Sequence, residues 1–147
     1  MRTVAIIATA GALTLMLTGC FGNPVESIVE QAIEDQTGVE VSAGGEDGVA
    51  SLPSDWPSEV PVPEGKLLLA LSMDGSYSAT IELGDEDAGM AGLDTYLLAG
   101  FAITSEADYG GLKSYQLSNP NYDVNYSFGP DADGVYVANL VVIASTQ

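Results

Sequence analysis

Between Tyr77 and Leu83 the sequence alternates strictly between apolar and polar residues. A period of two predicts a β-strand with one face in a core and the other face in solvent. Similar short runs, separated by glycine, proline, asparagine and aspartate, predict further strands at 66–72, 102–107, 112–118, 122–128 and 135–145. Residues 39–41 are a shorter strand candidate.

The run 135–145 differs from the other strand candidates because nearly every position in it is apolar. This composition is typical of a strand that is covered on both sides. We therefore expect it to be a central strand with both faces buried.

Two segments have the signals of helices. Residues 23–38 begin with an asparagine that can cap the helix, a proline at the first helical position and a glutamate that completes a capping box. The second helix is expected to begin at the acidic residues 85–87, which suit a helix N-terminus, and to end at Gly100. Its expected apolar face consists of Met90, Leu93, Leu97, Leu98 and Phe101.

These elements predict an α+β fold. We expect a small, mostly antiparallel sheet of about five or six strands, with two helices covering one face. The expected α+β domain comprises residues 66–147. It is preceded by a tether, helix and loop at 20–51 and by a proline-rich approach segment at 52–65.

The sequence Leu17-Thr18-Gly19-Cys20 begins at the last residue of an uncharged apolar run, residues 4–17. This run is too short to span a bilayer. It matches the lipobox of bacterial lipoproteins, in which cleavage before the cysteine leaves its thiol to carry a lipid. Residues 1–19 are therefore the expected signal peptide, Cys20 is the expected lipidation site, and the domain is expected outside the cytoplasm, anchored to the cell membrane. An ordinary secretory signal or a short membrane anchor are the alternatives.

The charge of the chain excludes many functions. The formal net charge is −18, with 21 acidic residues, three lysines and arginines together, and no histidine. Nucleic-acid binding lacks the cations it needs, and histidine-based nucleophiles and zinc, copper or haem sites lack their usual side chains. We expect no cofactor and, because like charges repel, a monomer. Calcium or magnesium, cationic partners, sugars and apolar ligands remain compatible.

Several residues are weak candidates for ligand binding. Trp56, within the proline-rich segment, is either an aromatic platform or, as we favour, a plug that pins the segment to the core. Tyr122 and Tyr126 could stack on a ligand, although tyrosines in sheets more often pack against other side chains. Asp131 and Asp133 could bind Ca²⁺, but an Asp-Ala-Asp-Gly sequence is also what a hairpin turn requires.

The chain resembles a group of uncharacterised actinobacterial membrane lipoproteins. The resemblance rests on the lipobox, on the segment LPSDWPSEVPVPEG at 52–65 and on a helix that ends in YLLAGF at 96–101. It covers most of the mature chain, from residue 23 to about residue 142, and implies an envelope protein of a Gram-positive actinobacterium, anchored on the outer leaflet of the plasma membrane. It implies no functional residue other than Cys20.

The sequence thus predicts a cell-surface lipoprotein with a non-enzymatic binding or interaction domain, whose partner is an unidentified envelope protein or ligand. A module that binds Ca²⁺ or a cationic ligand is the alternative. A glycoside hydrolase that uses two carboxylates is a more distant one, because no spacing among the acidic residues singles out a pair.

Overall fold

The computed structural model describes residues 39–44 and 48–146 of the chain. Cys20 and the helix expected at 23–38 lie outside these residues. The described part contains one helix, α2, and seven strands. In chain order these are β1 (Val39–Ala43), β2 (Lys66–Met73), β3 (Ser76–Glu82), α2 (Glu86–Leu98), β4 (Ala102–Tyr109), β5 (Leu112–Ser118), β6 (Tyr122–Pro130) and β7 (Tyr136–Ala144).

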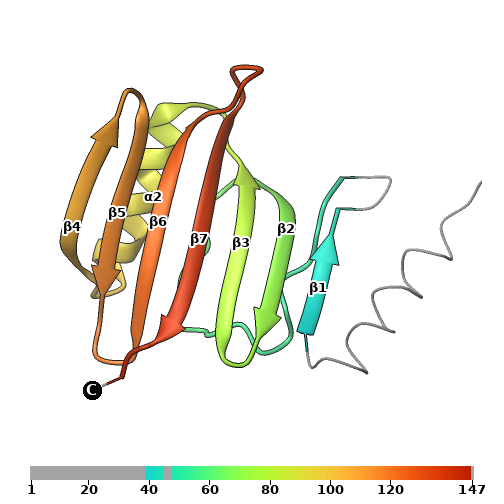
Figure 1. The fold of residues 1–147 in the computed structure, drawn as a ribbon, viewed down its shortest axis with the longest axis vertical. Helices are drawn as coiled ribbons and strands as arrows, with labels where there is room; N and C mark the ends of the chain where they lie inside the picture. Colours follow the sequence, from blue (N-terminus) through green and yellow to red (C-terminus); the bar gives the residue numbers. More distant parts are fainter. Residues whose placement is uncertain (1–38, 45–47, 147) are drawn as a thin grey trace, which may run out of the picture.

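All seven strands form a single sheet in the order β1-β2-β3-β7-β6-β5-β4 (Figure 1). Every neighbouring pair is antiparallel, so the predicted α+β class is confirmed. The expected number of five or six strands was too low. The additional strand is β1, which pairs with β2 from Val39 opposite Met73 to Ala43 opposite Leu69. This strand corresponds to the shorter candidate at 39–41, which the sequence indicated but which the expected number of five or six strands left out.

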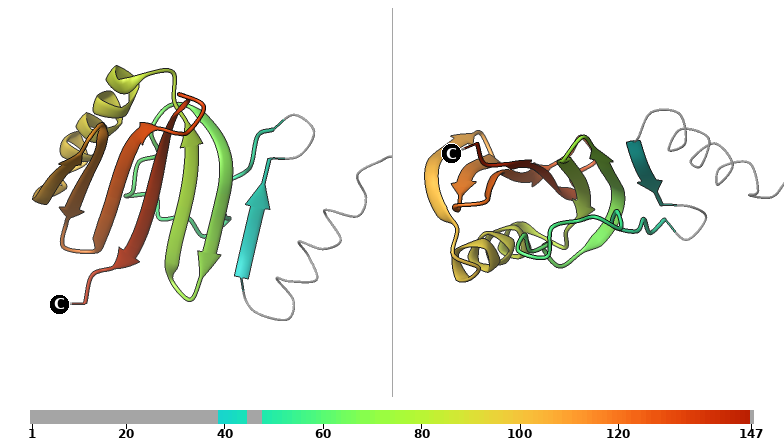
Figure 2. Two further views of the ribbon diagram at one scale, coloured as in Figure 1. Left: turned by 45° about the horizontal axis from the view of Figure 1, so that its top comes forward. Right: turned by 90° about the horizontal axis from the view of Figure 1, so that it is seen from below.

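The connection between β3 and β4 determines the topology. β3 lies next to the centre of the sheet and β4 lies at its far edge, so α2 crosses one face of the sheet between them (Figure 2). Successive hairpins then return the chain from β4 through β5 and β6 to β7, which pairs with β3. The helix therefore lies over the half of the sheet that is built after it.

The core lies between α2 and the sheet. On β6 and β7 every second side chain points to this side, and Tyr126, Phe128, Ala138, Leu140 and Val142 are all fully buried. Tyr126 packs against both Phe128 and Tyr96 of the helix, with 5.4 Å between ring centroids in each case. We call this side of the sheet the covered face.

Helix α2 begins at the acidic residues 85–87, as the sequence predicted. The Asp85 side chain caps it by accepting a hydrogen bond of 2.8 Å from the Ala88 N–H. The expected apolar face was wrong in part. Leu93 and Phe101 are buried, but Leu98 is 89% exposed, and the side of the helix that meets the sheet consists of Gly89, Gly92, Leu93 and Tyr96. The glycines leave room for large aromatic side chains from the sheet.

The segment 52–65 closes the rest of the covered face. Trp56 donates a hydrogen bond of 3.0 Å from its indole nitrogen to the Val60 carbonyl, and its ring packs edge-on against Tyr77 of β3. Val60 itself is only 3% exposed. These contacts confirm the interpretation of Trp56 as a plug that pins the segment to the core.

We predict that Gly89→Ala destabilises the protein by about 1–3 kcal/mol, because an added Cβ would collide with the ring of Phe128. In an exposed helix the same substitution stabilises by about 0.5–1 kcal/mol, so the sign of the effect is diagnostic. Urea unfolding measures the difference. Ala91→Ser, at an exposed position of the same helix, is the control and should change little. A more stable Gly89→Ala variant would contradict the close approach.

The hydroxyls of Tyr96 and Tyr126 provide a second, paired prediction. Both are buried, and burial raises both pKa values, so each hydroxyl stays protonated. Tyr126 donates a hydrogen bond of 2.9 Å to the Gly89 carbonyl, whereas the Tyr96 hydroxyl has no partner in the described structure. Tyr126→Phe should therefore cost about 1 kcal/mol, and Tyr96→Phe should be neutral or stabilising. Equal losses in the two urea titrations would contradict this assignment.

Candidate functional site

The central strand β7 is covered on one side only. Ala138, Leu140 and Val142 are fully buried on the covered face, but Val141 is 45% exposed and Ile143 is 50% exposed on the opposite face. The expectation of a strand buried on both faces was wrong. The strand is central, as predicted, but α2 and the segment 52–65 cover only one side of the sheet (Figure 2). The other side is the open face.

The strand register defines the open face as three rows of side chains that cross the sheet. Reading from β1, the first row is Val39, Met73, Ser76, Ile143, Asp123 and Ser118. The second row is Val41, Leu71, Ser78, Val141, Asn125, Gln116 and Ser105. The third row is Ala43, Leu69, Thr80, Asn139, Ser127, Ser114 and Ala107.

The open face is almost free of charge. Asp123 is the only charged residue in the three rows, although the chain contains 21 acidic residues. Lys66 and Glu82, which are opposite each other on β2 and β3, lie one row further along these strands. Apolar side chains occupy β1, β2 and part of β7, whereas serines and side-chain amides occupy β5 and β6. The open face therefore carries much less charge than the net charge of −18 would lead one to expect.

A hollow of about 420 Å³ lies on the open face where β5, β6 and β7 meet. Gln116, Asp123 and Asn125 line one part of it, Val141 and Ile143 line another, and Thr104 from the irregular part of β4 completes it. Gln116 and Asn125 are directly opposite each other on neighbouring strands. Among the described residues, neither amide nor the Asp123 carboxylate has a hydrogen-bonding partner for its side chain, so all three are free to bind a ligand.

The aromatic candidates do not contribute to this hollow. Tyr126 is fully buried, Tyr122 is half-buried against the core, and Trp56 is held by its bond to Val60. All three lie on the covered side, so the structure brings none of them to the open face. The polar residues that line the hollow went unnoticed in the sequence, although their positions between buried neighbours on β5 and β6 are the available signal.

In the turn between β6 and β7, the Asp131 side chain binds backbone groups of the turn itself. Oδ1 of Asp131 accepts hydrogen bonds of 2.9 Å from the backbone N–H groups of Asp133 and Val135, and Gly134 has a φ of 83°. These contacts confirm the turn interpretation of Asp131 and Asp133. In the region that the structure describes, no group of three or more acidic residues is arranged to hold a metal ion.

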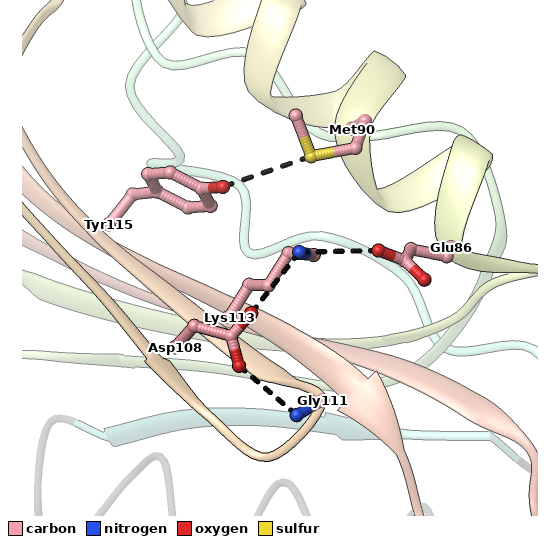
Figure 3. A network of polar contacts seen from close by, with 6 residues as sticks. All are labelled: Glu86, Met90, Asp108, Gly111, Lys113 and Tyr115. Atoms are coloured by element: carbon pink, nitrogen blue, oxygen red, sulfur yellow. Dashed lines mark hydrogen bonds and ion pairs between the residues drawn. The ribbon is translucent and has the colours of Figure 1, made fainter.

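A second polar cluster lies at the N-terminal end of α2, on the covered side (Figure 3). Lys113 of β5 places its Nζ 3.3 Å from a carboxylate oxygen of Glu86 and 3.3 Å from one of Asp108. These hydrogen bonds, chiefly the one to Glu86, raise the pKa of Lys113, and the Gly111 N–H lowers the pKa of Asp108. A lysine held in its charged form is neither a base nor a nucleophile. The cluster therefore ties the helix to the β4–β5 hairpin.

Comparisons with protein-family models, with curated proteins and with solved structures find no match for this chain. Among the described residues, no helix is long and apolar enough to cross a membrane.

Proposed function

We propose that the protein is a cell-surface lipoprotein, anchored through a lipid on Cys20, whose domain binds a partner or ligand on the open face without catalysing a reaction. The lipobox at 17–20 supports the anchor and the location outside the cytoplasm. The open face supports the binding function.

The observation that carries the proposal is the exposure of apolar side chains on an uncharged sheet face. Met73, Val141 and Ile143 are 51%, 45% and 50% exposed, and all three lie in the rows that contain one charge. Depletion of charged residues distinguishes the centre of a protein interface from the remaining surface. Other large apolar side chains are exposed elsewhere, such as Leu98 on α2 and Val49. Val141 and Ile143 differ from these because they line the hollow on the nearly charge-free face of the sheet.

The residue types support binding rather than catalysis. The chain has no histidine, and Lys113 is engaged by two carboxylates. Glycoside hydrolysis requires a pair of carboxyl groups across the scissile bond, at about 5–10 Å from each other. The hollow contains one carboxylate, that of Asp123. The calcium alternative loses its best candidate, because the backbone N–H groups of the turn already occupy an oxygen of Asp131.

We predict that the anchor depends on Cys20 alone. Replacing this residue in Cys20→Ser removes the only thiol in the chain and hence the site for the lipid. The variant should release the protein from the membrane and should not incorporate labelled fatty acid, whereas the parent chain should fractionate with membranes. Fractionation and metabolic labelling in a bacterial host measure both effects. Labelled fatty acid on the Cys20→Ser variant would contradict the proposal.

The binding surface can be tested by photo-crosslinking in the envelope of the producing cell. A photoreactive residue at Val141 should give a discrete adduct, because this side chain lies at the centre of the open face. The same residue at Leu98, which is 89% exposed on the helix, is the matched control and should give none. Ile143→Glu should abolish the Val141 adduct by placing a charge on the apolar surface.

Circular dichroism and thermal unfolding establish that each crosslinking variant is folded. The proposal is contradicted if the two positions give the same adducts, or if the Val141 adduct survives Ile143→Glu in a folded protein.

A further inference from the structure

We propose that the hollow on the open face binds a neutral, hydroxyl-rich ligand, namely a carbohydrate chain. This inference rests on the proposed binding function and specifies its ligand class. The charge of the hollow, its hydrogen-bonding groups, its apolar wall and its position in the sheet all favour this ligand class.

The charge of the hollow disfavours anionic ligands. Asp123 is its only charged residue, and no lysine lines it. Lys113 is engaged by Glu86 and Asp108 on the other side of the sheet, and Lys66 begins β2, which does not border the hollow. Phosphate and carboxylate groups normally require such cations. A negatively charged ligand would instead meet the Asp123 carboxylate and the strongly acidic chain around it.

The hydrogen-bonding groups of the hollow call for a ligand that both donates and accepts. The Asp123 carboxylate only accepts, and the amides of Asn125 and Gln116 each offer donors and an acceptor. The Thr104 hydroxyl donates a hydrogen bond of 3.1 Å to the backbone carbonyl of Gln116, so its oxygen can accept a further hydrogen bond. A hydroxyl donates and accepts through the same oxygen, so neighbouring hydroxyls on one ligand can satisfy all four side chains.

The apolar wall gives the ligand a second requirement. Val141 and Ile143 project from β7 beside the polar side chains of β5 and β6. Burying their exposed surface requires a ligand with an apolar face next to its polar groups. A sugar ring has this form, with C–H groups on its faces and hydroxyls at its edge.

The position of the hollow argues against an extended peptide. Peptides that add to a sheet do so at an edge strand, where backbone N–H and C=O groups are unpaired. β5, β6 and β7, which line most of the hollow, are each paired on both sides, and the edge strand β4 contributes only Thr104 to it. The backbones of the three paired strands therefore have no such groups to offer an extended peptide. A ligand in the hollow must therefore be bound by side chains, and side chains can hydrogen-bond to the hydroxyls of a carbohydrate.

The hollow suits retention of the ligand rather than its cleavage. The six side chains discussed above include a single carboxylate, and a glycosidic bond is normally broken between two. The bound carbohydrate is therefore expected to leave the site unchanged.

The test titrates the intact, lipidated protein in detergent with maltotetraose, N-acetylated chitotetraose and mannotetraose. Amide NMR shifts should concentrate at Gln116, Asn125 and Val141 for at least one of these neutral sugars. Binding should be unaffected by raising NaCl from about 0.05 M to about 0.5 M, because no ion pair is involved. Asp123→Asn should weaken it about tenfold, since a hydrogen bond to a charged group is lost. Asp94→Asn on α2 is the matched control and should have no effect.

A tetralysine peptide is titrated in parallel and should not bind. Peptide binding at Asp123 that disappears at high salt would overturn the carbohydrate proposal in favour of a cationic ligand. Failure of all three sugars to bind, or binding that tolerates Asp123→Asn, would also overturn it. If the Val141 adduct still forms in cells in that event, the open face is a binding surface for another ligand. Loss of both the sugar binding and the adduct removes the proposed function as well.

Discussion

The close approach of α2 to the sheet is the contact on which the rest of the structure depends. Gly89 and Gly92 bring the helix backbone so near to β6 that Phe128 and the Tyr126 hydroxyl occupy the space of their missing side chains. The Gly89 carbonyl then accepts the hydrogen bond from Tyr126. A single helix and the segment 52–65 thereby cover this face of the sheet. Large aromatic side chains fill the space between them and the strands.

This thin layer explains why one face of the sheet is buried and the other is exposed. A sheet of seven strands has two faces, and the described elements provide material for covering only one. The open face has kept Val141 and Ile143 exposed while the acidic residues are almost absent from it. Strong net charge favours solubility, so the acidic remainder of the surface compensates for a nearly uncharged area of this kind.

The sequence predicted what depends on local pattern and missed what depends on contacts between distant residues. The alternation in 77–83, the acidic start of α2 and the glycine at its end all correspond to elements of the structure. The helix face was misjudged because the apolar pattern favours Leu98, whereas the packing selects Gly89 for its lack of a side chain. No one-dimensional pattern distinguishes a glycine that breaks a helix from one that admits a ring.

The candidate site was missed for a related reason. An almost entirely apolar strand such as 135–145 indicates burial on both faces, but whether a second layer exists is a property of the whole fold. Gln116 and Asn125 are nine residues apart in sequence and become neighbours only through the register of β5 and β6. Trp56, Tyr122 and Tyr126 were candidates for ligand binding because aromatic rings can stack on ligands. Large rings also fill the core beneath a helix that carries glycines, and this is the role that the structure gives them.

The pairing of β3 with β7 has a consequence for how the chain reaches its native state. The central ladder joins distant residues such as Thr80 and Asn139, which are 59 positions apart and share a side-chain hydrogen bond. Neither half of the sheet can be completed until β7 has emerged, because β7 is the neighbour of both β3 and β6. Long-range pairing of this kind slows folding and leaves strand edges exposed meanwhile. The sheet therefore closes late, when the last strand of the chain pairs with β3 and β6.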